Sequence, residues 1–319
     1  MQKIIRYSVA LFFFYFFYSP STYARAFITD YHTTFFPAHD KHGQLVIAIR
    51  SYYLGAKPYF LVVDPYTLRT QALSASDLSA RRRAALPSER YFTYRQLNST
   101  PYMRALFQYT GMPYAVENAG ITHANHAVVG EFLTIDMCPS SHVFEKKFFM
   151  RLLDKANQTH KKLPIALSVS GLWILGHEQE FSWLLQEEKA NKFDITWTNH
   201  SFSHVYYRDL PLDQNFLLMP QTNFSQEVLA TEKLLLERGE LPSVFFRFPG
   251  LISSKQLLLA LRDQFSLIPV GTNAWLAHGG LIKTGSIILV HGNGNEPAGI
   301  AKIMPLIQTL TLLPLQQAY

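Results

Sequence analysis

Cysteine is almost absent from this chain of 319 residues, which contains Cys138 and no other. A single thiol cannot form an intramolecular disulfide, so the fold has to be stabilised by its core. Charged residues are also scarce at 16%, whereas apolar residues make up 48% and aromatic residues 14%. This composition supplies a sizeable core and excludes an intrinsically disordered protein. Internal repeats and low-complexity segments are lacking as well.

A long apolar run stands out at the start of the chain, from Tyr7 to Tyr18. Lys3 and Arg6 precede the run, and Ala24-Arg25-Ala26 follows it as a small-x-small cleavage site. The run is short compared with the roughly 20 residues that span a membrane. The pattern therefore predicts a signal peptide over residues 1–26 and a periplasmic or secreted protein, with an uncleaved membrane anchor as the alternative.

Positive charge is mild once that segment is removed. Residues 1–26 contain Lys3, Arg6, Arg25 and no acid, so their loss lowers the formal net charge from +6 to +3. An excess this small does not predict a nucleic-acid partner. The basic run Arg81-Arg82-Arg83 is more typical of a solvated loop.

Two segments differ in pattern after residue 26. Residues 27–128 contain two β-branched and aromatic runs, 44–49 and 59–63, which predict two strands and a smaller α+β segment. From residue 129 to 319, short apolar runs alternate with amphipathic stretches, which is typical of a parallel α/β domain. We expect strands at 131–135, 165–169, 193–197, 244–246, 267–270 and 286–290, and helices at 144–156, 179–190, 226–238, 254–263 and 298–310.

A histidine pair separated by four residues, His200 and His204, follows the predicted strand 193–197. On a helical turn, residues i and i+4 project from the same face. Two imidazoles in that arrangement can bind one divalent metal ion, although a catalytic zinc normally has three protein ligands.

Other reactive side chains also stand where predicted strands end, and such ends share one face of a parallel barrel. A strand-end carboxylate (Asp136), an arginine (Arg247) and a last histidine (His291) join the histidine pair in this group. A metal with a base and an acid beside it suits hydrolysis of an amide or ester.

The order of these motifs resembles the polysaccharide deacetylase family, the family 4 carbohydrate esterases. The family's motifs are Thr-Phe-Asp-Asp-Gly-Pro, His-Ser/Thr-x-x-His, Arg-x-Pro-Tyr/Phe, Asp-x-x-Asp-Trp and a final strand ending in histidine. The matching stretches here are Thr134-Ile135-Asp136-Met137-Cys138-Pro139, His200-Ser201-Phe202-Ser203-His204, Arg247-Phe248-Pro249-Gly250, Asn273-Ala274-Trp275 and Ile288-Leu289-Val290-His291.

The resemblance implies a distorted (β/α) barrel over residues 129–319 and a metal-dependent hydrolase that acts on C–N bonds other than peptide bonds. It implies that Asp136 is the catalytic base, His291 the acid, and Arg247 the residue that tethers the base. His200 and His204 become ligands of a divalent metal, most simply zinc. Substrate-binding positions are Trp275, Leu289 and Pro249. The implied partner is a polysaccharide such as peptidoglycan or chitin.

Two motifs depart from the family pattern. Met137 stands where the family has the aspartate that completes its metal triad, and a thioether is a poor ligand for such ions. Asp136 itself, the thiolate of Cys138, or His142 could replace that ligand. In the fourth motif, Asn273 and Ala274 stand where acids are expected.

These observations support an exported carbohydrate deacetylase that removes N-acetyl or O-acetyl groups. Because of the departures, a glycan-binding protein that kept the fold and lost the chemistry is an alternative. A related hydrolase acting on another acyl or amide bond is a further one.

Overall fold

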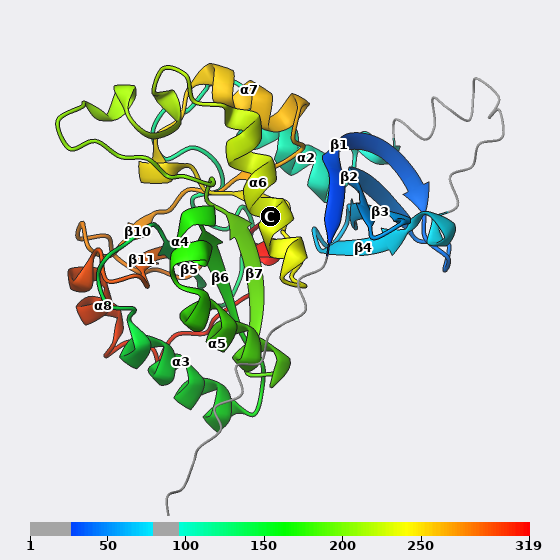
Figure 1. Cartoon of the computed structure of the whole chain (residues 1–319). Helices are drawn as coiled ribbons and strands as arrows, with labels where there is room; N and C mark the ends of the chain where they lie inside the picture. The colour runs from blue at the N-terminus through cyan, green and yellow to red at the C-terminus, as the bar shows by residue number, and fades with distance from the viewer. Residues whose placement is uncertain (1–26, 79–95) are drawn as a thin grey trace, which may run out of the picture.

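The structure, a computed structural model, describes residues 27–78 and 96–319 and contains two sheets (Figure 1). The predicted signal peptide and the run Arg81-Arg82-Arg83 lie outside the described residues. Within the described part, no helix is both long enough and apolar enough to cross a membrane.

A four-stranded antiparallel sheet forms the N-terminal part, with strand order β1-β2-β3-β4. The predicted strands 44–49 and 59–63 are confirmed as β2 and β3, which pair as an antiparallel hairpin. The sheet is followed by a short 3₁₀ helix, η1, and by helix α2, whose first turn is capped by Thr100. The bounds are β1 Ile28–His39, β2 Leu45–Leu54, β3 Lys57–Val63, β4 Thr70–Ser74, η1 Ala75–Asp77 and α2 Pro101–Tyr109.

A seven-stranded sheet forms the larger part, in the order β10-β11-β5-β6-β7-β8-β9, and every pair in it is parallel. The sheet curls into a partial barrel, which confirms the predicted α/β class. The strands are β5 Phe132–Met137, β6 Leu163–Val169, β7 Phe193–Asn199, β8 Phe245–Phe246, β9 Ile268–Pro269, β10 Ala274–Trp275 and β11 Ile287–His291.

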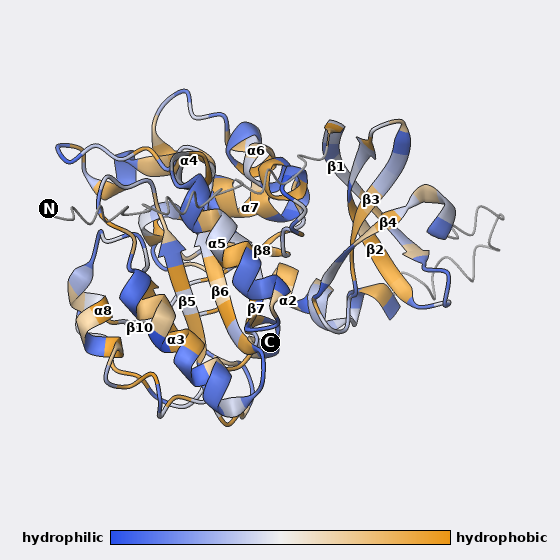
Figure 2. Cartoon of the chain, turned by 60° about the horizontal axis from the view of Figure 1, so that its bottom comes forward, coloured by the Kyte–Doolittle hydropathy of each residue, from blue (hydrophilic) through white to orange (hydrophobic). Residues whose placement is uncertain are grey.

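Helices cover the outer face of this sheet, and their apolar faces pack on its hydrophobic strands (Figure 2). Asn223 caps α6 through the amide of Gln226, and Ser254 caps α7 through that of Leu257. The α-helices are α3 Lys146–Thr159, α4 Gly171–Gly176, α5 Glu178–Lys189, α6 Phe224–Glu237, α7 Lys255–Asp263 and α8 Pro297–Ile303. The remaining 3₁₀ helices are η2 Leu212–Gln214, η3 Phe216–Leu218, η4 Pro249–Leu251 and η5 Leu315–Ala318.

The predicted closing helix over 298–310 is too long, because α8 ends at Ile303 and turns follow it. Pro305 explains the difference, because a proline has no amide proton to donate within a helix and its ring clashes with the carbonyl four residues earlier. Met304 itself keeps helical backbone angles. Strand β5 also continues through Asp136 to Met137, past its predicted end at 135.

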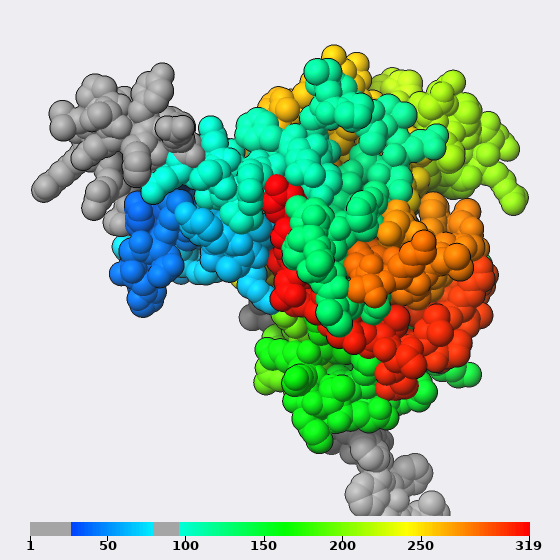
Figure 3. Space-filling model, turned by 180° about the vertical axis from the view of Figure 1, so that it is seen from behind, coloured from blue at the N-terminus to red at the C-terminus, as the bar shows by residue number. Residues whose placement is uncertain are grey.

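The chain between α2 and β5 crosses the back of the parallel sheet beside the C-terminal residues (Figure 3). Isolated bridges join Ile121 to Val270 and His123 to Ser286. The amide of Asn125 donates to the carbonyl of Ala318. This segment thus contacts the parallel sheet near both of its edges, next to β9 and next to β11.

A buried ion pair joins the N-terminal sheet to helix α6 of the larger part. Arg50 of β2 donates to both carboxylate oxygens of Glu232 on α6, at 2.6 and 2.8 Å, and Tyr31 donates to the same carboxylate at 2.8 Å. Arg50 and Glu232 are 0% and 1% exposed. The N-terminal sheet is therefore fixed to the larger part by a fully desolvated contact.

Candidate active site and metal centre

The carboxyl edge of the parallel sheet gathers the predicted site residues. In the register, Asp136 at the end of β5 lies beside His291 on β11 and beside Ser168 on β6. His200 follows β7 and Arg247 follows β8. Strands that are far apart in the sequence thus place a carboxylate, two imidazoles and a guanidinium at one edge of the sheet, as is typical of parallel α/β barrels.

The loop 200–204 holds the histidine pair, and it is not the helical turn that we expected. Ser201 and His204 adopt left-handed backbone conformations, with φ of 65° and 47°. Glu227 on α6 compensates by accepting hydrogen bonds from the amides of Phe202 and Ser203, both at 2.8 Å. The two imidazoles still meet, with ring centroids 4.7 Å apart.

One nitrogen of His200 is available as a ligand. Its Nδ1 lies 2.8 Å from the backbone carbonyl of Arg247, and because a carbonyl only accepts, Nδ1 carries the proton. The lone pair of the neutral ring is therefore on Nε2, which lies 3.5 Å from Sγ of Cys138. A second nitrogen, Nε2 of His204, is buried without a hydrogen-bond partner in the described part of the chain.

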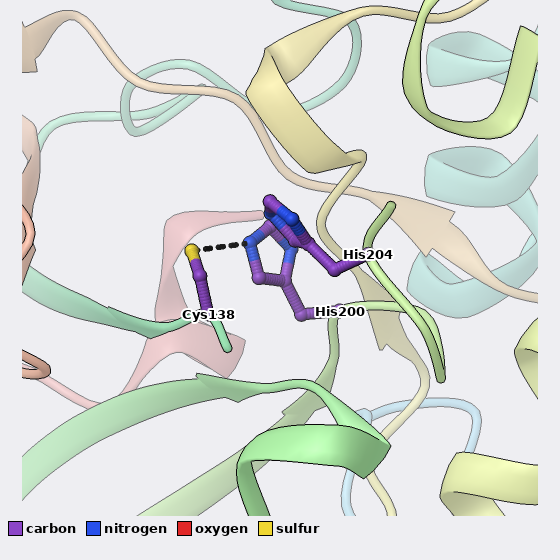
Figure 4. A group of neighbouring side chains, drawn as sticks. All are labelled: Cys138, His200 and His204. Carbon is purple, nitrogen blue, oxygen red and sulfur yellow. Dashed lines mark hydrogen bonds between the residues drawn. The ribbon is translucent and has the colours of Figure 1, made fainter. Parts of the chain in front are cut away.

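Cys138, His200 and His204 form a group whose ligand atoms all lie within 4.8 Å of one another (Figure 4). A sulfur and a nitrogen bound to one tetrahedral zinc are about 3.6 Å apart, which follows from Zn–S and Zn–N bonds of about 2.3 and 2.0–2.1 Å. The 3.5 Å between Cys138 and His200 matches that separation. The residues present thus fit a divalent metal ion.

Asp136 lies next to this group and is held by positive charge. Its Oδ2 is 3.7 Å from Nη1 of Arg247 and 3.7 Å from Nε2 of His200. Burial alone would raise the pKa of Asp136, but the charges of Arg247, His200 and His291 lower it below its usual range. The carboxylate is therefore ionised at neutral pH, as a base requires. Its Oδ1 is buried without a hydrogen-bond partner in the described residues.

Arg247 is fully buried, and only part of its hydrogen-bonding capacity is used. Its Nη2 donates to Oγ1 of Thr134 at 3.0 Å and to the carbonyl of Gly271 at 3.2 Å. Nε and Nη1 have no hydrogen-bond partner among the described residues. Asn273, where the family pattern has an acid, instead accepts from the amide of Ile287. Asp136 is thus the carboxylate near this guanidinium.

Burial would also raise the pKa of the Cys138 thiol, but the nearby His204, His200 and His291 lower it well below its usual range. Burial would lower the pKa of His291, yet Cys138, Glu296 and Asp136 raise it well above the usual value.

His291 and Trp275 share one partner that sequence reasoning missed. Oε2 of Glu296 lies 2.8 Å from Nδ1 of His291 and accepts a hydrogen bond from Nε1 of Trp275 at 2.8 Å. Glu296 follows β11 by a few residues, so an acid soon after the last motif was the available signal. Glu227 carried no such signal, because it lies on a helix far from the loop in sequence.

The predicted substrate positions differ in exposure. Trp275 is half-buried, with its ring centroid 6.3 Å from that of His291. Leu289 is 1% exposed and precedes His291 by two residues, which puts both on the same face of β11. Pro249 is buried in η4, beside Gly250, which packs against Phe216.

Met137, at the position of the family's third ligand, and His142, one candidate to replace that ligand, both lie elsewhere. Met137 is fully buried in the hydrophobic core, where its sulfur lies near Gly292 together with Ile135 and Phe149. His142 is exposed and lines a separate cavity of about 450 Å³ with Trp183. Neither belongs to the metal-binding group.

Comparison with known proteins gives one family model and several solved structures. Residues 29–103 match the family model described as the RP012 protein N-terminal domain. The chain is also similar to solved structures of low sequence identity. A family 4 carbohydrate esterase from Bacillus anthracis is 20% identical, with 63% of this chain and 87% of that chain covered and a TM-score of 0.43.

Two further structures are similar to a comparable degree. Peptidoglycan deacetylase PdaC from Bacillus subtilis is 17% identical, with 60% and 89% of the two chains covered and a TM-score of 0.42. A CE4 family pseudoenzyme from Bacillus anthracis is 12% identical, with 61% and 66% covered and a TM-score of 0.41. Both enzymes and pseudoenzymes occur among the similar structures.

Proposed function

We propose that this protein is an exported, metal-dependent deacetylase that hydrolyses N-acetyl or O-acetyl groups of a polysaccharide such as peptidoglycan or chitin. The observation that carries the proposal is the convergence of Asp136, His200, Arg247 and His291 at one edge of the parallel sheet. The order of the five motifs supports the substrate class, and residues 1–26 support export.

Each residue has a chemical task in this reaction. Asp136, kept ionised by Arg247, takes a proton from the attacking water, and His291 on the neighbouring strand gives a proton to the leaving amine or alcohol. His200 and His204 would hold the divalent ion. That ion supplies Lewis acidity, which polarises the acetyl carbonyl and makes water more acidic. Trp275 forms a wall for the sugar beside His291.

The experiment is acetate release from acetylated glucosamine oligomers by the purified chain with added zinc or cobalt. We expect Asp136→Asn and His291→Ala to lower kcat by about 10²- to 10⁴-fold, the range for a general acid or base. His42→Ala, at an exposed histidine in the turn between β1 and β2, is the matched control and should keep full activity. Equal activity in wild type and both site variants would refute the proposal.

A glycan-binding protein without catalysis is the second candidate. It is favoured by Nε and Nη1 of Arg247, which have no hydrogen-bond partner among the described residues, and by the core position of Met137. Such a protein would sediment with insoluble chitin or peptidoglycan and release no acetate at any metal concentration. Binding that persists in His200→Ala without turnover in the wild type would establish this function instead.

A further inference from the structure

The third ligand of the metal centre can be assigned from the structure. Three atoms compete for that place: an oxygen of Asp136, the sulfur of Cys138 and a ring nitrogen of His142. A protein ligand has to lie within reach of both histidine nitrogens, since one ion contacts all three donors. Cys138 meets this condition, because its Sγ and the histidine nitrogens lie within 4.8 Å of one another.

Cys138 is also held in place by its backbone. Nδ2 of Asn293 donates to the carbonyl of Cys138 at 2.7 Å, and the amide and hydroxyl of Ser170 donate to the preceding carbonyl of Met137. The side chain of Cys138 is 5% exposed. The sulfur of Cys138 is therefore a buried donor with a restrained backbone, and it lies beside two imidazoles. Such an arrangement is preorganised for metal binding.

The two competitors have other surroundings. Asp136 is not part of the group, and its Oδ2 lies at equal distances of 3.7 Å from His200 and Arg247. His142 is exposed and lines the cavity beside Trp183. Assigning the sulfur as ligand leaves Asp136 free to act as base.

We infer that Cys138 binds the metal ion as a thiolate, so that the centre is Cys-His-His and takes a thiophilic dication such as zinc, cobalt or cadmium in preference to magnesium or manganese. On binding, the metal–sulfur bond forms and the proton held between Cys138 and the neighbouring histidines passes to solvent. Thiolate ligands favour zinc, whereas magnesium and manganese prefer oxygen ligands. The inference rests on the metal dependence proposed above.

Cobalt spectroscopy on the full chain tests the ligand without any turnover. Cobalt(II) bound to a thiolate gives a sulfur-to-metal charge-transfer band in the near ultraviolet. Because Cys138 is the one cysteine of the chain, any such band from the stoichiometric complex reports this residue. We expect the band in the wild type, its loss in Cys138→Ser, and its retention in Asp136→Asn and His142→Ala.

Metal competition gives a second readout. We expect Cys138→Ser to lower zinc affinity by about 100-fold or more, at least the loss seen when residues supporting a ligand are removed. Cys138→Asp should lower the affinity for zinc and reduce the ratio of zinc affinity to manganese affinity. Release of the proton held between Cys138 and the histidines, which zinc binding causes in the wild type, should disappear in Cys138→Ser.

Two results would overturn the inference. One is stoichiometric cobalt binding by the wild type without the charge-transfer band, which needs no variant. The other is the absence of any cobalt or zinc binding. The result can be separated from that of the acetate assay. A charge-transfer band without acetate release would support the metal centre and contradict the proposed deacetylase activity. Acetate release without the band would contradict only the assignment of Cys138 as a ligand.

Discussion

The carboxylate of Glu296 lies 2.8 Å from Nδ1 of His291, so the proposed catalytic acid has a negatively charged partner on the side away from its Nε2. The same carboxylate oxygen accepts the indole proton of Trp275. One acid therefore orients both the proton donor and the aromatic wall beside it.

We predict that Glu296→Gln lowers kcat by about 10-fold or more and changes KM little, because the amide cannot stabilise protonated His291. Steady-state acetate release measures both constants. Trp275→Phe is the matched control, since it removes the other partner of Glu296 and should act mainly on KM. An unchanged kcat in Glu296→Gln would show that His291 needs no such partner.

Met137 gives a second prediction. Restoring the family's aspartate at this position by Met137→Asp should not add a metal ligand, because the side chain at 137 points into the hydrophobic core. Burial of an unpaired carboxylate should instead destabilise the fold by several kcal/mol. Urea unfolding and zinc titration measure the two effects. The conservative Met137→Leu should cost less than about 1.5 kcal/mol. Tighter zinc binding by a stably folded Met137→Asp would contradict this placement.

The ion pair between Arg50 and Glu232 gives a third prediction. Glu232→Gln leaves the buried guanidinium without its counter-charge and should lower the free energy of unfolding by about 3–5 kcal/mol. The double variant Arg50→Met with Glu232→Leu should recover much of that loss. Asp194→Asn is the control, because its ion pair with Arg69 is exposed and is expected to contribute less than about 1 kcal/mol. Denaturant unfolding of all variants provides the comparison, and equal effects of Glu232→Gln and Asp194→Asn would refute the prediction.

A pair of carboxyl groups far from the site predicts a pH dependence of stability. Burial, together with the neighbouring charge of Glu188, raises the pKa of Glu240 to about 8 from its ordinary value of 4.5. Glu188 is itself held by the indole of Trp197 and the amide of Ile195. Between these pH values the folded state binds more protons than the unfolded state, so stability falls as pH rises from about 4.5 to 8.

Glu240→Gln removes the titrating group and should flatten that slope. We expect its Tm to exceed that of the wild type by about 2 °C or more at pH 8.5, where about 1 kcal/mol of stability corresponds to 2–4 °C in a protein of this size class. At pH 5 the two proteins should unfold at similar temperatures. Parallel Tm curves from pH 5 to pH 8.5 would exclude Glu240 as the cause.

Periodicity in the sequence predicted much of the larger part because each buried strand is a short apolar run between amphipathic helices. The strand-end positions of Asp136 and His291 follow from that pattern. Loop conformation did not, because Ser201 and His204 adopt left-handed geometry that depends on Glu227, a residue on a distant helix. Strand alternation held an unused signal: with residue 136 facing the site, residue 137 must face the core.

Long-range pairs lay beyond the reach of the sequence for a different reason. Arg50 and Glu232 are 182 residues apart, and each in isolation has the pattern of an ordinary charged position. Their pairing depends on how the N-terminal sheet packs against helix α6, and local periodicity in the sequence does not encode that packing.

Helix α6 carries two glutamates that restrain different parts of the molecule. Glu227, in its first turn, restrains the loop that carries the histidines, and Glu232, just over one turn later, grips the N-terminal sheet through Arg50. Removing the N-terminal sheet would take away Arg50 and Tyr31, the partners of Glu232, on the same helix whose Glu227 restrains the histidine loop. One helix therefore connects the first sheet to the loop that carries His200 and His204.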